Sequence, residues 1–168
     1  MLKLLIPCLK VDTLYDIDLA ELQKRGIRGV VFDLDNTLIP WNSPEICPDI
    51  LNWLNNLVSQ GFKLCLVSNN GTRRVRQIAE QCGAPFVARA LKPSRTGFRQ
   101  AVAAMELTPT AVAVVGDQLF TDILGGNRLE LYTIWVKPLA TKEFIGTKIT
   151  RQLEKLAVRL LKATGKLP

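Results

Sequence analysis

The sequence predicts an α/β fold built on a mainly parallel sheet. Short apolar runs alternate with segments of helical period along the 168 residues, a pattern typical of βαβ units. Several runs are almost wholly apolar, as expected for strands covered on both faces. With 48% hydrophobic residues, the whole chain, residues 1–168, is expected to form a single domain with its own core.

The first half of the chain predicts two strands and two helices. Residues 18–24 favour a short helix ended by Gly26, and the rest of the first 25 residues gives no clear pattern. The first clear strand is expected at residues 27–32 and the next at residues 62–67. Between them residues 48–59 predict a helix, because Pro48 suits a first turn and Gly61 suits a C-terminal cap.

The second half continues the alternation. Further strands are expected at residues 86–88, 111–115 and 131–136. Helices are expected at residues 72–82, from Ser94 or Arg95 to residue 105, and at residues 122–129.

A basic amphipathic helix is expected at about residues 149–163. From Lys137 onward the chain holds eight basic and two acidic residues, which is nearly the whole net charge of +7. Such a segment favours an anionic partner, whether acidic lipid, nucleic acid or phosphorylated substrate, or is simply a solvated helix face. We expect the apolar stripe of this helix to pack on the protein and the basic stripe to face outward. The apolar stripe is Ile149, Leu153, Leu156 and Leu160, and the basic stripe is Lys148, Arg151, Lys155, Arg159 and Lys162.

Composition excludes several function classes. The chain has no histidine, and its four cysteines form no Cys-x-x-Cys pair, which argues against a structural zinc site. No cysteine begins a Cys-x5-Arg motif, so a cysteine-dependent phosphatase is excluded. No apolar run approaches the roughly 18 residues of a membrane span, and the apolar start is too short for a secretory signal. We therefore expect a cytoplasmic protein that is not secreted.

Polar side chains follow four of the predicted strands, at the point where each strand ends. Asp33 and Asp35 follow the first of these strands, Ser68 the second, and Asp117 the fourth, with Asp122 five residues on. Lys92 lies shortly after the third of them. Because ligands of open parallel sheets sit beyond the carboxyl ends of the strands, these groups are expected to converge on one crevice.

The chemistry of such a set is narrow. Several carboxylates at one point need a hard cation, and Mg²⁺ prefers oxygen ligands. One carboxylate can act as nucleophile on phosphorus, and a second can move protons. A hydroxyl and a lysine can hold phosphoryl oxygens. Taken one at a time, each motif is equally typical of a turn or a surface loop, so the prediction depends on their joint occurrence.

These motifs, in this order, resemble the haloacid dehalogenase (HAD) superfamily over roughly residues 29–136. The resemblance implies a Rossmann-like, doubly wound sheet with helices on both faces. It implies that Asp33 is the nucleophile and a metal ligand. Asp35 would be the general acid/base and give its main-chain carbonyl to the metal, Lys92 would stabilise the charged intermediate, and Asp117 and Asp122 would complete a Mg²⁺ site. The Asp at position 35 further implies a phosphatase or phosphotransferase.

The same resemblance assigns the phosphate contacts. Ser68, with Asn69 beside it, would bind the phosphoryl group together with Thr37 and Lys92, and Thr37 would also support the loop. About thirty residues separate Asp35 from Ser68, and fewer separate Ser68 from Lys92. Neither gap has room for a cap domain, so we expect an open site that suits a large or surface-bound substrate.

The longer motifs are residues 33–41, 67–70, 90–93 and 115–118, followed by Thr121 and Asp122. They resemble the YqeG-like family of subfamily IIIA, which is related to phosphatidylglycerophosphate phosphatases. That resemblance implies removal of the terminal phosphate of phosphatidylglycerophosphate to give phosphatidylglycerol, a step of phospholipid metabolism. The partners would be an anionic phospholipid substrate and, at the periphery, an anionic membrane surface, with no nucleic acid.

Two alternatives remain. One is a soluble phosphomonoesterase that acts on a nucleotide, a sugar phosphate or a phosphoprotein. The other is a non-catalytic nucleic-acid-binding or interaction protein, which the basic tail favours and the complete motif set disfavours.

Overall fold

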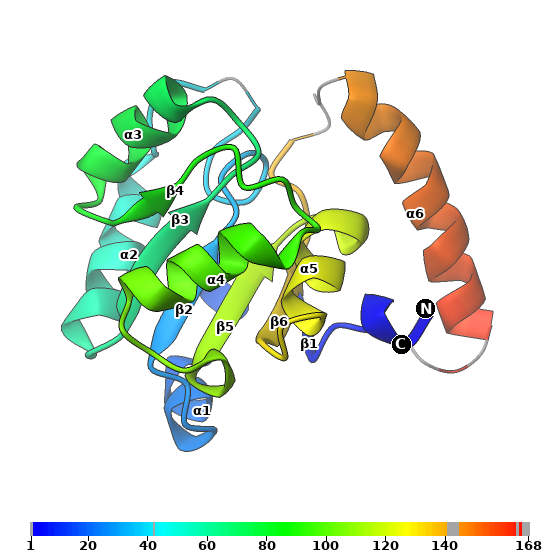
Figure 1. Cartoon of the computed structure of the whole chain (residues 1–168), viewed down its shortest axis with the longest axis horizontal. Coiled ribbons are helices and arrows are strands. Elements are labelled where there is room, and N and C mark those ends of the chain that lie inside the picture. Colours follow the sequence, from blue (N-terminus) through cyan, green and yellow to red (C-terminus); the bar gives the residue numbers. More distant parts are fainter. Residues whose placement is uncertain (1, 42, 141–144, 164, 166–168) are drawn as a thin grey trace.

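The structure is a computed structural model that describes residues 2–41, 43–140, 145–163 and 165. Its centre is a six-stranded, all-parallel sheet with the order β1-β6-β5-β2-β3-β4 (Figure 1). The strands are β1 (Leu9–Val11), β2 (Gly29–Phe32), β3 (Lys63–Val67), β4 (Phe86–Val87), β5 (Val112–Gly116) and β6 (Tyr132–Val136).

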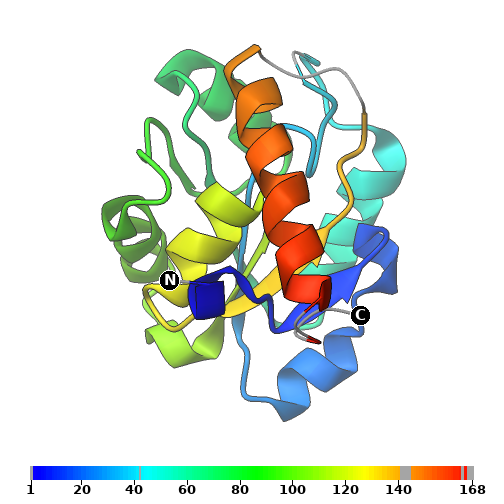
Figure 2. The same ribbon diagram turned by 90° about the vertical axis from the view of Figure 1, so that its right-hand side faces the viewer.

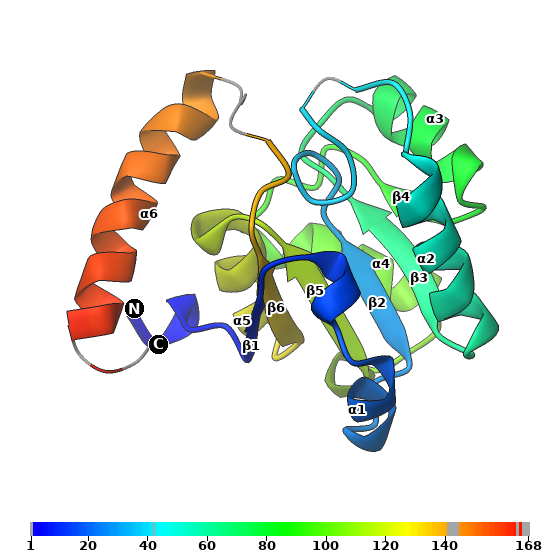
Figure 3. The ribbon, with the colours of Figure 1, turned by 180° about the vertical axis from the view of Figure 1, so that it is seen from behind.

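Helices cover both faces of the sheet, as predicted for a doubly wound α/β fold. They are α1 (Leu19–Lys24), α2 (Pro48–Ser59), α3 (Thr72–Gln81), α4 (Arg95–Ala104), α5 (Leu124–Asn127) and α6 (Ile145–Ala163). Helices α2 and α3 pack on one face, and α4 and α5 lie on the other (Figures 1 and 3). Short 3₁₀ turns occur at Leu2–Leu5, Leu14–Asp16 and Pro109–Ala111, and a π-helical turn spans Leu119–Ile123.

The central strand β2 shows why this sequence forms a sheet buried on both sides. All four of its residues are buried. Val30 and Phe32 contribute to the cluster under α2 and α3, whereas Val31 contributes to the cluster under α4. Because successive side chains point to opposite faces of the sheet, one continuous apolar run contributes to two hydrophobic cores.

The strand order changes direction at β2, and this creates the crevice. From β2 the chain continues to β3 and β4 on one side, then crosses to β5 and β6 on the other. Loops that leave the two sides at such a point diverge above the sheet, which is where open α/β folds bind ligands.

Most predicted elements are confirmed. The helix expected at residues 122–129 is instead a π-helical turn at Leu119–Ile123 followed by the short helix α5, and the other main differences lie at the chain's two ends. Strand β1 has only three residues and pairs with β6, far away in sequence, so local pattern did not identify it. Between Asp35 and Ser68 the described residues form only α2 and β3 as regular elements, in agreement with a site that has no cap domain.

The expectation for the apolar stripe of α6 was wrong at its three described leucines, whereas Arg159 and Lys162 of the basic stripe are exposed as expected. The helix starts at Ile145, and among its described side chains the buried ones are Glu154, Ala157 and Leu161. Leu153, Leu156 and Leu160, which were expected to pack inward, are about half exposed, at 56%, 55% and 48%. Figure 2 shows α6 lying on the surface across the N-terminal segment and α5.

The physical reason is an anchoring hydrogen bond. Glu154 Oε1 accepts from the Phe120 amide at 3.2 Å, and small Ala157 allows close approach to the cluster around Leu119 and Ile123. The buried face therefore turns away from the most apolar stripe. The side chains of Ile149, Lys148, Arg151 and Lys155 lie outside the described residues. Of the helices described, none combines the length and the apolar character that a bilayer crossing requires.

Candidate active site

Asp33 lies at the carboxyl end of the central strand. Its amide donates to Val115 O at 2.9 Å, which extends the pairing of β2 with β5 by one residue beyond the strand. This backbone bond fixes the side chain at the point where the strand order changes, and the residue is only 6% exposed. A buried carboxylate requires partners, because leaving it unpaired away from water is costly.

Lys92 is the first of those partners. Its ammonium group donates to Asp33 Oδ1 at 2.5 Å, to Asp122 Oδ1 at 2.7 Å and to the Val67 carbonyl at 3.3 Å. Asn69 fixes the lysine's backbone, because its Oδ1 accepts from the Lys92 amide at 2.7 Å and its Nδ2 donates to the Lys92 carbonyl at 3.2 Å. One cation is thus held between two carboxylates from different strand ends.

Three aspartates form a compact acidic cluster. Carboxylate oxygens of Asp33, Asp117 and Asp122 all lie within 4.8 Å of one another, and all three residues are buried. Thr37 Oγ1 joins two of them, at 3.2 Å from Asp33 Oδ2 and 3.4 Å from Asp117 Oδ1.

The turn after β5 explains how Asp122 reaches the cluster. Asp122 lies in the π-helical turn, where the Ile123 amide donates to Gln118 O at 3.3 Å, and its own Oδ2 accepts from the Gln118 amide at 3.2 Å. Gly116 is required here, because a Cβ at that position would overlap the Asp122 side chain. π-Helical turns recur at functional sites, and this one brings a carboxylate over the strand end.

The electrostatics of the cluster favour a proton or a cation. Burial raises the pKa of Asp33 to about 7; the charge of Lys92 opposes this rise and the charge of Asp122 adds to it. Burial alone would lower the pKa of Lys92, but the charges of Asp122 and Asp33 outweigh burial and raise that pKa above its usual value. Lys92 is therefore a permanent cation.

The donor set fits a hard divalent cation. Three ionised carboxylates and one ammonium leave a surplus of two negative charges, which one divalent ion would neutralise. The oxygens are of the kind that Mg²⁺ prefers. Asp33, Asp117 and Asp122 would hold such an ion, which would neutralise charge on a phosphoryl group bound beside it.

The Asp35 carboxylate lies outside this cluster. Its Oδ1 accepts from Arg74 Nη2 at 2.7 Å and its Oδ2 from Asn70 Nδ2 at 2.6 Å. Arg74 is itself fixed, since its Nη1 donates to the Ser43 carbonyl at 2.7 Å. Asp35 is thus held by hydrogen-bond partners that differ from those of Asp33. Its contribution to metal binding through the main-chain carbonyl stays a prediction.

The residues predicted to contact phosphate differ in their positions and in their hydrogen-bond partners. Ser68 is buried at the end of β3, and its Oγ accepts from the Asn70 amide at 3.1 Å. Asn69 bonds the Lys92 backbone, so it acts at least as a support for the lysine. The phosphate-binding roles of Ser68, Asn69 and Thr37 stay predictions.

The sequence did not reveal Arg74 and Asn70 as partners of Asp35. Asn70 directly follows Ser68 and Asn69, two of the predicted site residues, so its position gave some signal. Arg74 is one of three arginines in the first half of α3 and gave none, because surface helices commonly carry such residues.

The arrangement separates two carboxylates by environment, which is typical of acid/base and nucleophile pairs. Asp33 faces a lysine and an acidic cluster, whereas Asp35 faces an arginine and an amide. A phosphoryl group placed beside Asp33 would meet a carboxylate oxygen, a fixed ammonium group and a cluster of carboxylates that could hold a cation.

Comparison with known proteins identifies the family of the chain. Residues 41–129 match the family model "haloacid dehalogenase-like hydrolase", a range that begins after Asp33 and Asp35. The "Probable phosphatase YqeG" of Bacillus subtilis is 39% identical over 97% of this chain and 95% of its own length. "Phosphatidylglycerophosphate phosphatase 1, chloroplastic/mitochondrial" of Arabidopsis thaliana is 28% identical over 94% of this chain but only 47% of its own length.

Among solved structures, the fold resembles the cobalt-bound deoxy-D-mannose-octulosonate 8-phosphate phosphatase YrbI of Haemophilus influenzae. The TM-score is 0.54 at 14% identity, with 84% of this chain and 91% of that chain covered, so the likeness concerns the fold alone. Taken with the family match and the near full-length similarity to YqeG, the chain belongs to the haloacid dehalogenase-like hydrolases, among the phosphatases related to YqeG.

Proposed function

We propose that this protein is a Mg²⁺-dependent phosphatase that works through an aspartyl-phosphate on Asp33 and acts on phosphatidylglycerophosphate at an anionic membrane surface. The observation that carries the chemistry is the position of Asp33, buried between Lys92 and the Asp117–Asp122 pair.

The residues divide the reaction into two steps. In the first, an Asp33 oxygen attacks phosphorus, the bond from phosphorus to the leaving oxygen breaks, and Asp35 gives that oxygen a proton. In the second, Asp35 takes a proton from water, the water oxygen attacks phosphorus, and the Asp33–phosphorus bond breaks to release phosphate. Lys92 holds negative charge on the phosphoryl oxygens throughout. Arg74 and Asn70 orient Asp35 between these proton transfers.

The rim of the active site supports a substrate with an apolar part. Three exposed large apolar side chains lie on segments that adjoin the site residues: Trp41, Leu91 and Leu139 are 40%, 76% and 45% exposed. The Trp41 amide donates to Asn36 Oδ1 at 3.2 Å and the Leu139 amide to the Asn36 carbonyl at 2.9 Å, so both flank the Asp33 loop. Leu91 directly precedes Lys92. Single exposed apolar side chains need no explanation, but three on segments that adjoin the site favour contact with lipid.

Helix α6 supports a membrane partner independently. Its outer face combines the half-exposed Leu153, Leu156 and Leu160 with exposed Arg159 and Lys162. A helix with apolar and cationic residues on one outer face binds anionic bilayers, and each basic residue near the surface contributes about 1 kcal/mol. We assign this face to an anionic bilayer, which would make the protein peripheral on a membrane, in keeping with the expected cytoplasmic location.

The similarity to phosphatidylglycerophosphate phosphatase 1 supports the substrate, at 28% identity. The soluble phosphomonoesterase remains the second candidate, because the more similar YqeG carries no substrate in its name.

The test is phosphate release from vesicles that contain phosphatidylglycerophosphate, compared with a panel of soluble phosphomonoesters. We expect release that requires Mg²⁺, stops with EDTA and is absent in Asp33→Asn. Cleavage of soluble esters without cleavage of the lipid would establish the second candidate instead. Failure to cleave any ester, beside salt-dependent nucleic-acid binding, would favour a non-catalytic role.

A further inference from the structure

A shallow surface hollow of about 570 Å³ opens beside Asp35, and three arginines line it. Arg73 and Arg74 come from α3, and Arg89 comes from the segment after β4. The residues that line it include no Asp or Glu. Two separate segments of the chain thus bring positive charge to one place next to the reacting groups. We call this the arginine hollow.

Arg74 ties the arginine hollow to the active site. It lines the hollow and at the same time donates to Asp35 Oδ1 at 2.7 Å. The Arg89 amide donates to the Asn70 carbonyl at 3.0 Å, and the Asn70 side chain contacts Asp35. Both walls of the hollow are therefore fixed relative to Asp35 by hydrogen bonds.

The positive charges of Arg73 and Arg89 are available to bind an anion. Both residues are exposed, and across the described ranges neither guanidinium group forms an ion pair. Surface arginines usually pair with acids or point singly into water, whereas these converge on a hollow without an acidic lining. Guanidinium groups match phosphate geometry, with two parallel N–H donors per group.

We propose that the arginine hollow is a second anion-binding site, which holds a second phosphate of the substrate while the terminal phosphate reacts at Asp33. This rests on the proposed function. Phosphatidylglycerophosphate carries a phosphodiester one glycerol away from its terminal monoester, and phosphatidic acid carries the monoester alone. The hollow therefore selects for the substrate with two phosphates.

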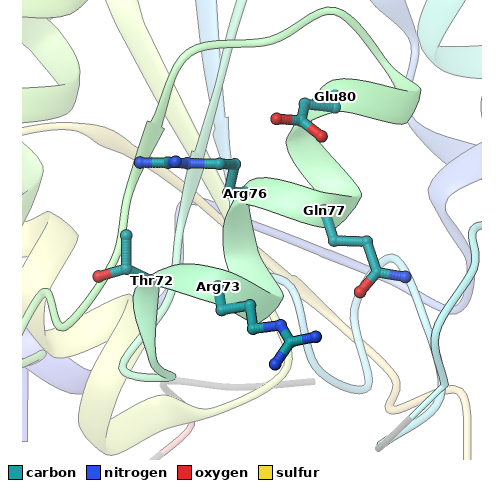
Figure 4. A pocket seen from close by; sticks show the side chains of 5 residues that line it. All are labelled: Thr72, Arg73, Arg76, Gln77 and Glu80. Atoms are coloured by element: carbon teal, nitrogen blue, oxygen red, sulfur yellow. The ribbon is translucent and has the colours of Figure 1, made fainter.

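A neighbouring hollow on α3 supplies a matched control. It has about 430 Å³ and is lined by residues that include Arg73, Arg76 and Glu80 (Figure 4). Arg76 and Arg73 project from α3 in different directions, and Arg76 does not line the arginine hollow. Arg76→Ala removes the same charge from the same helix without touching the proposed site.

The experiment compares kcat/KM for phosphatidylglycerophosphate and phosphatidic acid, each in phosphatidylcholine vesicles. In Arg73→Ala and Arg89→Ala we expect the preference for phosphatidylglycerophosphate to fall by about tenfold to a hundredfold, as one charged hydrogen bond predicts. The loss should lie mainly in KM. Arg76→Ala should keep the wild-type preference.

The outcomes are distinct. An unchanged preference in both variants overturns the proposal, and so does an equal loss on both lipids, since that would place the arginines at neighbouring headgroups or at the catalytic centre. A loss of the same size in Arg76→Ala also overturns it.

A second experiment measures binding affinity and does not require catalytic turnover. Asp33→Asn protein should bind glycerol bisphosphate at least tenfold more tightly than glycerol phosphate, and adding Arg73→Ala and Arg89→Ala should remove that difference. If wild-type protein leaves phosphatidylglycerophosphate intact while this difference holds, the lipid substrate is wrong and the anion site stands. If no difference exists, the anion site is wrong whatever the enzyme cleaves.

Discussion

Arg74 holds Asp35 by an ion pair of 2.7 Å between Nη2 and Oδ1, and both side chains are largely shielded from solvent. The arginine also bonds the Ser43 carbonyl, so it connects the loop after β2 to α3. The carboxylate to which we assign the proton transfers is therefore oriented by a residue outside the four recognised motifs.

Replacement of Arg74 should slow turnover more than it weakens binding. Arg74→Ala frees Asp35 from its orientation, and we expect kcat to fall by about ten- to a hundredfold, in line with the value of a charged hydrogen bond. Arg74→Lys should restore part of the rate, because lysine keeps the charge but loses the second donor direction. Steady-state kinetics on a soluble ester measure this, with Arg76→Ala as control. A change confined to KM would show that Arg74 does not act through Asp35.

The glycine at position 116 should prove necessary for the metal site. A Cβ in Gly116→Ala would overlap Asp122, so the side chain or the π-helical turn must shift. We expect a loss of about 1–3 kcal/mol in unfolding free energy from overpacking. Mg²⁺ affinity should fall about tenfold or more, as measured by calorimetry. Gly71→Ala is the control for metal affinity, since a Cβ there meets nothing within 4 Å. Wild-type Mg²⁺ affinity in Gly116→Ala would contradict the role of Asp122.

Asp33 should make stability without metal depend on pH. Its pKa rises from 3.8 to about 7 in the folded protein, mainly through burial. Between about pH 4 and pH 7 the folded state therefore holds a proton that the unfolded chain has lost, so the free energy of unfolding falls as pH rises. The difference in unfolding free energy between wild type and Asp33→Asn, measured in EDTA, should decline through this window. Added Mg²⁺ competes with the proton and should stabilise the wild type more at pH 8 than at pH 5. A difference that is flat with pH would contradict this.

The leucines on α6 should matter for membrane binding and not for folding. Changing Leu153, Leu156 and Leu160 to Gln removes half-exposed apolar surface, so binding to anionic vesicles should weaken while the unfolding free energy stays nearly unchanged. Leu161→Ala is the opposite control: that residue is buried, and its loss should cost about 2–5 kcal/mol. Co-sedimentation and thermal unfolding measure the two effects. If the triple variant instead converts a dimer to a monomer, the face joins two copies of the chain.

The sequence predicted the fold where local signals and packing agree. Helix α2 has the predicted bounds, because Pro48 and Gly61 mark its ends and its apolar face points to the sheet. Asp33, Lys92, Asp117 and Asp122 meet as expected, since parallel strands bring their carboxyl ends to one edge.

The sequence did not predict the features that depend on contacts between residues far apart in the chain. The orientation of α6 depends on the bond between Glu154 and the Phe120 amide, which reverses the usual rule that a carboxylate faces water. The role of Arg74 depends on a contact with Asp35 across 39 positions, and no local pattern reports such a contact.

The central claim is that phosphate passes through Asp33. Asp35→Asn should slow the attack of water more than the first transfer to a good leaving group, so phosphoenzyme should accumulate during reaction with a reactive soluble ester and Mg²⁺. Peptide mass spectrometry of the quenched protein should then find one phosphoryl group on Asp33, absent when Asp33→Asn is added. Phosphate release at the wild-type rate by Asp33→Asn, or a phosphoryl group on another residue, would contradict the mechanism.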